Sequence, residues 1–78
     1  MPYNQQLDER VFSKSWESDN ERLTVSVFSY NHGQKKLQIS REAKDANGEY
    51  RFGKLGRLRK DELEAVLPLM QEALKSMD

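Results

Sequence analysis

The sequence contains no cysteine, one histidine and two prolines among its 78 residues. The absence of cysteine excludes disulfide bonds and the cysteine-based zinc sites that stabilise many short chains. A chain of this length forms one small domain and buries only about 60% of the surface that its unfolded form exposes, so we expect it to gain stability by self-association. Signal-peptide and membrane-spanning patterns are also absent, since no apolar run approaches about 18 residues. We therefore expect a cytoplasmic protein without a membrane partner.

The whole chain has no excess of positive or negative charge, but one segment of it does. Lys and Arg together number 13, as do Asp and Glu, so the formal net charge is zero. Residues 33–60, called here the basic segment, nevertheless hold nine basic and three acidic residues, a local balance of +6. Such a segment is typical of a surface that binds a polyanion. It is equally compatible with a solvated strand surface whose Lys and Arg discourage edge pairing.

Alternation of apolar and polar residues predicts strands over most of the chain. We expect a flexible tail over residues 1–10 and then four strands, at residues 11–16, 23–30, 36–43 and 49–58. The Asn-Gly pair at residues 47–48 predicts the turn before the last strand, because both residue types tolerate a positive φ.

The second expected strand has the clearest pattern. Leu23, Val25 and Val27 share one face of it. Phe28 and Tyr30 lie on the opposite face, where aromatic side chains stand among polar ones.

Near the C-terminus the hydrophobic period changes from two to 3.6 residues, which predicts an amphipathic helix over residues 60–77. Its apolar stripe consists of Leu63, Val66, Leu67, Met70, Leu74 and Met77. Residues 11–78 are therefore expected to form one α+β domain, a four-stranded antiparallel sheet followed by a single C-terminal helix (ββββα). A helix of 18 residues is about 27 Å long and overhangs a sheet about 15–20 Å across. The overhang would expose apolar side chains unless a second copy of the chain covers them.

Residues that could perform catalysis are scarce. His32, the sole imidazole, lies in an expected turn, where a histidine is usually exposed to solvent. The helix carboxylates Asp61, Glu62 and Glu64 favour the helix dipole, which explains them structurally. No pattern indicates a nucleophile beside a base, paired pocket carboxylates or clustered metal ligands. We therefore expect a protein that is not an enzyme and has no cofactor, metal or small-molecule substrate.

Aromatic side chains next to the basic segment point to another activity. Phe28 and Tyr30 lie beside it, and aromatic platforms flanked by cations are typical of proteins that bind single-stranded nucleic acid. Whether the strand is DNA or RNA stays open, because that choice depends on contacts to a 2′-hydroxyl. The alternative is a protein–protein interaction module whose basic hairpin docks an acidic partner. Such a site does not require aromatic residues interleaved with cations.

Three motifs in the part of the chain from Val25 onward carry a family resemblance. They are the strand end Ile39-Ser40-Arg41-Glu42, the hairpin from Asp45 to Gly48-Glu49, and the Gly53-Lys54-x-Gly56 strand that leads directly into a helix. Through them about two thirds of the chain resembles the transcriptional coactivator family named positive cofactor four, in its short bacterial form. The resemblance implies a curved sheet, dimerisation largely through the helix, and binding of single-stranded DNA across the sheet with little sequence preference. The Pur-repeat and Whirly families share a similar plan and ligand class.

The resemblance also implies roles for single residues. Tyr30 stands at a base-stacking position, and Arg51 and Lys54 stand at basic positions after the turn. Ala43 replaces a base-stacking tryptophan of the coactivator form, and Trp16 or Phe52 could supply that platform instead. The expected nucleic-acid-binding residues are Phe28, Tyr30, Lys35, Lys36, Arg41, Arg51, Phe52, Lys54 and Arg57. The expected dimer interface is the helix stripe of Leu63, Val66, Leu67, Met70, Leu74 and Met77.

Overall fold

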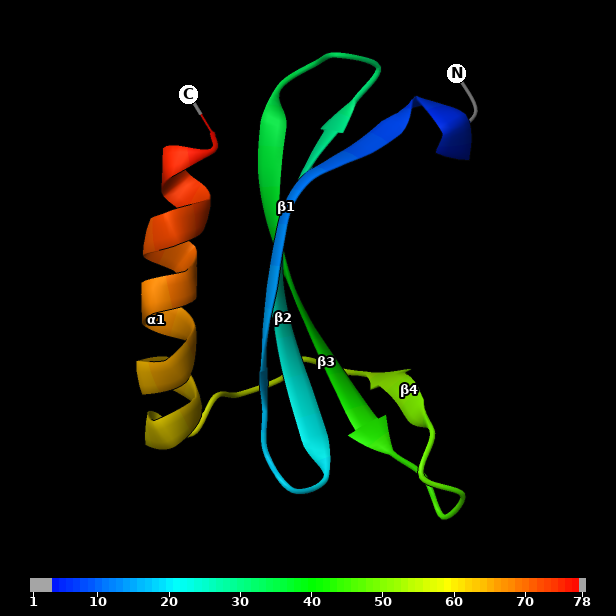
Figure 1. Cartoon of the computed structure of the whole chain (residues 1–78), viewed down its shortest axis with the longest axis vertical. Helices are drawn as coiled ribbons and strands as arrows, with labels where there is room; N and C mark the ends of the chain where they lie inside the picture. Colours follow the sequence, from blue (N-terminus) through cyan, green and yellow to red (C-terminus); the bar gives the residue numbers. More distant parts are fainter. Residues whose placement is uncertain (1–3, 78) are drawn as a thin grey trace.

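The computed structural model describes residues 4–77 and shows one sheet with one long helix against it (Figure 1). In chain order the elements are a 3-10 helix η1 (Gln5–Leu7), strands β1 (Asp8–Glu17), β2 (Glu21–Tyr30), β3 (Lys35–Lys44) and β4 (Tyr50–Gly53), and helix α1 (Lys60–Lys75). The strands are antiparallel in the order β1-β2-β3-β4, and the sheet is open. The predicted α+β class and ββββα order are confirmed.

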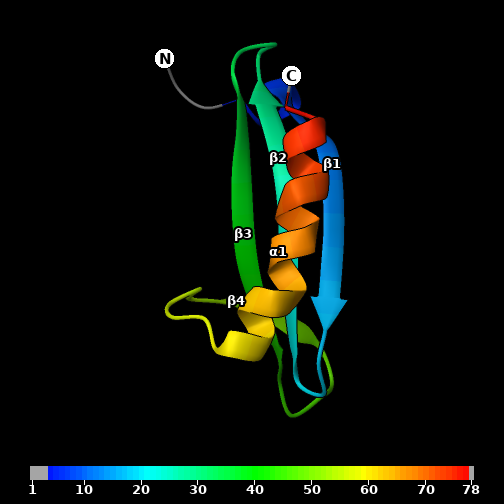
Figure 2. The same ribbon diagram turned by 90° about the vertical axis from the view of Figure 1, so that its left-hand side faces the viewer.

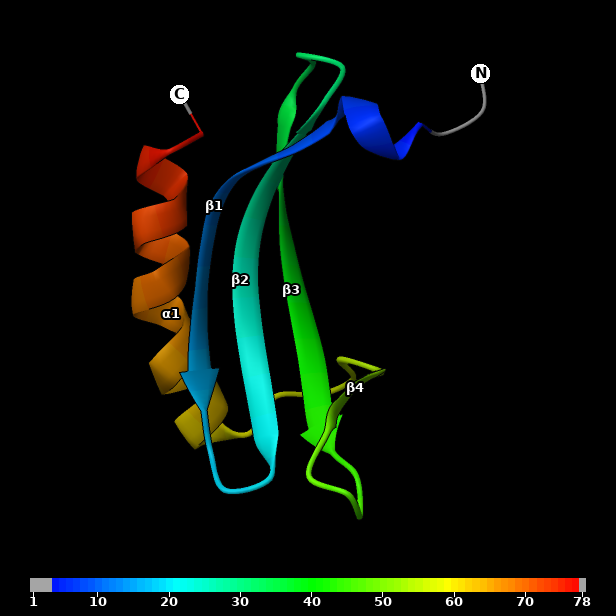
Figure 3. The same cartoon turned by 45° about the vertical axis from the view of Figure 1, so that its right-hand side comes forward.

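Helix α1 covers one face of the sheet and leaves the other face open. It packs on β1 and β2, and the view along that side shows it in front of these two strands (Figure 2). The strands curve along their length, and β4 lies at the far end of the sheet from β1 (Figure 3). The two faces are therefore distinct environments, and the face away from α1 is called the open face below.

The core lies between β2 and α1. Leu23, Val25 and Val27 of β2 are fully buried, together with Val66 and Ala73 of α1. These are the β2 residues predicted to share one face, and the period of two explains why they all point toward the helix. Burial of aliphatic side chains contributes about 1.5–3 kcal/mol each, so this small group supplies much of the stabilisation of the fold.

Strand β1 begins earlier than its sequence pattern indicates. Residues 4–10 were expected in a flexible tail, but Gln5–Leu7 form η1 and β1 starts at Asp8. A register shift between Arg10 and Phe12 breaks the pairing with β2 and disrupts the alternation on which the prediction relied. The N–H of Asn31 donates to the carbonyl of Leu7, which joins η1 to the β2–β3 turn. The rest of the expected tail, residues 1–3, lies outside the described residues.

Strand β4 ends at Gly53, five residues before the predicted end. Beyond it, Gly56 has φ 57, a left-handed conformation that a continuing strand does not adopt. Residues 54–59 instead cross from β4 to the start of α1 (Figure 1).

The two turns on either side of β3 differ in which residues take a positive φ. In the β3–β4 turn, Gly48 has φ 80 and its N–H donates to the carbonyl of Asp45 at 3.0 Å. The carboxylate of Asp45 also accepts from the N–H of Asn47 at 2.8 Å. The turn predicted from the Asn-Gly pair is confirmed. In the β2–β3 turn, Asn31 and His32 take positive φ values of 51 and 58 without glycine.

Candidate nucleic-acid interface

Cross-strand register decides which side chains share the open face. Directly opposite residues of neighbouring strands point to the same side of a sheet. Phe28 of β2 faces Arg10 of β1 and Lys36 of β3, and Tyr30 faces Asp8. The predicted placement of Phe28 and Tyr30 opposite the buried β2 residues therefore holds, and it puts both rings on the open face beside two cations.

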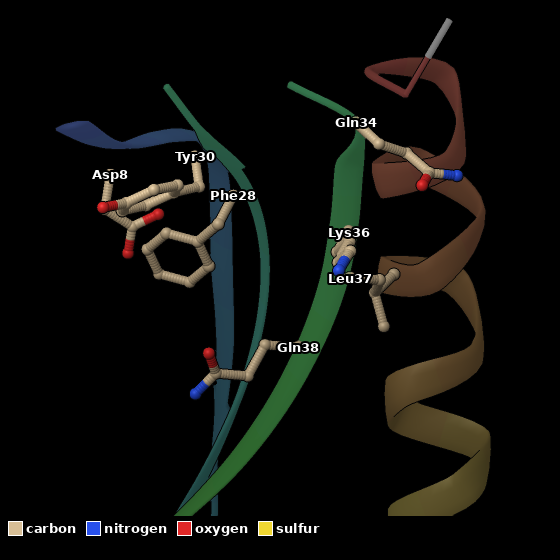
Figure 4. A pocket seen from close by; sticks show the side chains of 7 residues that line it. All are labelled: Asp8, Phe28, Tyr30, Gln34, Lys36, Leu37 and Gln38. Carbon is tan, nitrogen blue, oxygen red and sulfur yellow. The ribbon is translucent and has the colours of Figure 1, made fainter. Parts of the chain in front are cut away.

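These rings lie at the rim of an open hollow of about 610 Å³ near the β2–β3 turn. Figure 4 shows the side chains of Asp8, Phe28 and Tyr30 gathered on the side of the sheet away from α1, with Gln38 extending to that same side. The phenol oxygen of Tyr30 accepts a hydrogen bond from the N–H of Asn4 at 2.7 Å. This hydrogen bond from Asn4 helps to hold the Tyr30 ring in position.

Hydroxyl side chains form the middle of the open face. Ser13 and Ser26 lie within 3.4 Å of each other across β1 and β2, and Ser15 and Thr24 within 2.8 Å. A second hollow of about 310 Å³ runs over these residues and Ser40. Because the side chains are short and already hydrogen-bonded to one another, they make a low, polar floor that an extended chain could approach closely.

A second aromatic group lies at the other end of the open face. The guanidinium carbon of Arg22 stands 4.1 Å from the centre of the Tyr50 ring, and Lys44 Nζ stands 5.5 Å from it. Arg22 also donates to both carboxylate oxygens of Glu42, at 3.0 and 2.7 Å. This hydrogen bonding lowers the pKa of Glu42, which keeps the carboxylate ionised. Phe52 pairs with Glu42 in register and is 79% exposed.

Several predicted binding residues lie away from this face. Lys35 is opposite the buried Ser29, which places it on the side of α1. Arg51 forms an ion pair with Asp45 at 2.7 Å, and this contact lowers the pKa of the Asp45 carboxyl. Lys54 and Arg57 are exposed in the segment between β4 and α1. Of the predicted set, Phe28, Tyr30, Lys36 and Phe52 share the open face.

Arg41, also predicted to contact nucleic acid, lies on the other side of the sheet and binds groups of this chain. It faces Leu23 on the side of α1, and its side chain is 11% exposed. Its guanidinium donates to the carboxylate of the buried Glu62 and to the carbonyls of Leu55 and Arg57. Arg41 therefore fixes the segment between β4 and α1, and the helix beyond it.

Three cations of the open face were not among the predicted nucleic-acid-binding residues. Arg10 fell in the expected tail, and Arg22 and Lys44 each lie one residue outside an expected strand. Alternate residues counted backwards from Phe28 along β2 reach Arg22, so the sequence pattern could have placed Arg22 on the same face as Phe28. Trp16, one candidate to replace the missing tryptophan, pairs with Leu23 and packs against the core. Phe52, the other candidate, lies on the open face.

The predicted dimer stripe divides into a buried and an exposed part. Val66 is fully buried within the single chain, as part of its core. Leu63 and Leu67 are each 50% exposed, and Leu74 is 65% exposed. Glu72 forms an ion pair with Lys14 of β1, which orients one flank of α1 toward β1. The other flank, which carries the exposed leucines, faces the side of β3.

Comparisons with family models, with curated proteins and with solved structures find no match to this chain. Among residues 4–77, no helix has the length and apolar character needed to cross a membrane.

Proposed function

We propose that this chain binds single-stranded nucleic acid, and single-stranded DNA in particular, on its open face and without catalysis. The observation that supports this function best is the arrangement along the open face. Aromatic rings lie at both ends, represented by Phe28 and Phe52, and hydroxyl side chains lie between them. Because Phe28 and Arg22 are six residues apart on β2, the two ends are separated by about 20 Å. An extended strand with splayed bases can reach both.

The physical basis is the same at both ends. A base stacked on an aromatic ring contributes about 1–3 kcal/mol, largely independent of base identity. Phosphates between the stacked bases would lie close to Arg10 and Lys36 at one end and to Lys44 at the other, and each neutralised phosphate releases counterions. The carboxylate of Glu42 lies on this surface too, but its bidentate contact with Arg22 compensates its charge.

A docking module for an acidic protein is supported less well by the same structure. Such a module needs the cations of the basic segment to act together. At least four of its nine basic residues instead form ion pairs with carboxylates: Arg41, Arg51, Arg59 and Lys60. The remaining cations are divided among the open face, the side of α1 and the segment after β4. The aromatic rings of the open face are the more distinctive feature, and they favour nucleic acid.

We also propose that the chain acts as a homodimer through α1. Its exposed leucines, with Met70, recur at spacings of four, three and four residues, the pattern of a helix that packs against another helix. The partly buried Leu37 and Ile39 of β3 extend this apolar surface on the side that the stripe faces. Because α1 covers the sheet face opposite the open face, pairing of helices would leave both nucleic-acid surfaces accessible.

Fluorescence anisotropy with labelled oligo-dT, a matched duplex, oligo-U and an acidic peptide tests the function. We expect oligo-dT to bind more tightly than the duplex at the same salt concentration, because paired bases cannot reach the rings. Comparison with oligo-U measures the preference for DNA. Equal affinity for the single strand and the duplex would contradict stacking on the open face. Tight binding of the acidic peptide alone would support the docking module instead.

A further inference from the structure

We propose that Gln38 of β3 contacts the edge of the base that stacks on Phe28, and that its carboxamide can pair with any of the four bases there. This inference rests on the proposed function and adds to it the group that contacts the base edge. Gln38 extends to the same side of the sheet as Phe28 (Figure 4), and these two residues line both hollows of the open face. They therefore lie where the aromatic end of this face meets its hydroxyl middle.

The register of β2 and β3 brings Gln38 within reach of a base on Phe28. Lys36 lies directly opposite Phe28, and Gln38 lies directly opposite Ser26, two residues away along β2. Gln38 is thus a diagonal neighbour of Phe28, and such neighbours lie about 7–8 Å apart, within reach of long side chains. Because stacked rings are offset from one another, the edge of a base on Phe28 can project over β3 toward the Gln38 carboxamide.

The carboxamide of Gln38 is available for such a contact. Within residues 4–77 no hydrogen bond engages it, and the side chain is exposed. Its register partner Ser26 differs, because the Ser26 hydroxyl already pairs with that of Ser13. A base that covers the carboxamide removes it from water, so the amide then needs a partner. The edge of the base supplies one.

A carboxamide suits a base of any identity. It presents a carbonyl oxygen, which accepts, next to an amino group with two N–H donors. Each base carries a donor beside an acceptor on its Watson–Crick edge: N3–H and O4 in thymine, the N4 amino group and N3 in cytosine, the N6 amino group and N1 in adenine, and N1–H and O6 in guanine. Rotation about the last side-chain bond exchanges the two ends of the amide, so it can match either order. Gln38 therefore holds a base without selecting one.

Anisotropy titrations of the full chain and of its Gln38→Leu variant, with labelled oligonucleotides of about 12 nucleotides, test the contact. The probes are oligo-dT, oligo-dC and an oligonucleotide of alternating dG and dT. Leucine has no hydrogen-bonding group, so the variant should lose about 2- to 10-fold in affinity for each of the three probes. Unchanged affinity for all of them would overturn the contact. A loss with only some of them would overturn its tolerance of any base.

The variant Gln38→Glu tests the pattern of donors and acceptors, because a carboxylate only accepts hydrogen bonds. Guanine presents two adjacent donors, N1–H and the N2 amino group, whereas thymine places its single N–H between two carbonyl oxygens that a carboxylate repels. The added charge also repels the phosphates of every probe, and this effect cancels in a ratio of affinities. The ratio of alternating dG-dT to oligo-dT affinity should therefore rise about 5-fold or more above that of the wild type. An unchanged ratio would place the base edge away from Gln38 and overturn the proposal.

Gln34 provides the matched control. It is exposed and borders the same hollow, but its side chain points toward the side of α1 (Figure 4). Gln34→Leu should leave all three affinities unchanged, and Gln34→Glu should leave their ratios unchanged although it adds the same charge. Equal effects at the two positions would mean a general change of the surface and would contradict a contact at Gln38.

The outcome for the proposed function is separate. Weakened oligo-dT binding in Phe52→Ala, together with unchanged binding in Gln38→Leu, would overturn the Gln38 contact and leave the proposed function intact. Failure of the wild-type chain to bind any of the three probes would overturn both.

Discussion

Arg41 of β3 holds Glu62 of α1 by two hydrogen bonds, from Nη1 to Oε2 at 2.5 Å and from Nη2 to Oε1 at 3.3 Å. Glu62 is 1% exposed, and its Oε1 also accepts from the N–H of Arg59 at the start of the helix. Arg59 provides no serine or threonine hydroxyl at this position, so Glu62 satisfies the helix terminus from within. One ion pair thus joins the sheet, the segment before α1 and the first turn of α1.

Replacement of Arg41 should therefore affect folding rather than binding. We predict that Arg41→Ala lowers the free energy of unfolding by about 3–5 kcal/mol, because the buried carboxylate of Glu62 loses the guanidinium that holds it most closely. Urea denaturation followed by circular dichroism measures this loss. Arg10→Ala is the control, since Arg10 is exposed on the open face and its removal should change stability by less than about 0.5 kcal/mol. A stable Arg41→Ala protein with weakened DNA binding would restore Arg41 to the interface.

The same pair predicts how stability depends on acid. The hydrogen bonds from Arg41 lower the pKa of Glu62 below its ordinary value of 4.5. The folded state therefore holds the proton less tightly than the unfolded state, and the pair stabilises the fold fully above the unfolded pKa. That contribution decreases as the pH falls below about 4.5 and through the folded pKa. In Glu62→Gln, which does not titrate, unfolding free energies measured between about pH 3 and pH 7 should depend less on pH. An unchanged pH profile would show that other carboxyls control the acid response.

The sequence predicts some of these features more readily than others. The strict alternation around Leu23, Val25 and Val27 identifies the buried face of β2, because no bulge interrupts it. The bulge in β1 removes that signal, so Asp8 and Arg10 were assigned to a tail.

The role of Arg41 illustrates a different limit. Alternation through Leu37 and Ile39 already places Arg41 on the apolar face, but its positive charge suggested a surface contact. Its partner Glu62 lies 21 residues further along the chain, and no local pattern joins the two. The early end of β4 has the same cause, since Arg41 binds the carbonyls of Leu55 and Arg57 and draws the chain toward α1.

The exposed leucines of α1 predict the oligomeric state. Leu74→Glu places a charge in the proposed helix interface, and we expect it to convert the dimer into a monomer in sedimentation equilibrium. The control is Lys75→Glu, which puts the same side chain one position further on and about 100° around the helix. It should remain dimeric. A wild-type chain that sediments only as a 9.2 kDa species at micromolar concentration would contradict the proposed dimer.

Phe52 provides a test of stacking that leaves the fold intact. Because its side chain is 79% exposed, Phe52→Ala should not change the thermal unfolding midpoint. It should weaken oligo-dT binding by about 1–3 kcal/mol, the contribution of one stacked base, with little change in the salt dependence. Anisotropy titrations at several salt concentrations measure both quantities. Unaltered affinity in this variant would remove the far end of the open face from the interface.

A comparison of Lys35 and Lys36 can distinguish direct contact with a phosphate from a long-range effect of positive charge. They are adjacent in β3, but Lys36 faces Phe28 on the open face and Lys35 faces Ser29 on the side of α1. Each substitution by alanine removes one positive charge, so a long-range electrostatic effect would be nearly the same for both. A direct contact differs, because it releases a counterion from the strand. Lys36→Ala should lower the slope of log K against log salt by about 0.7, the single-strand value for one contact, and Lys35→Ala should leave it near that of the wild type. Equal slopes in the two variants would mean that the strand does not lie along the open face.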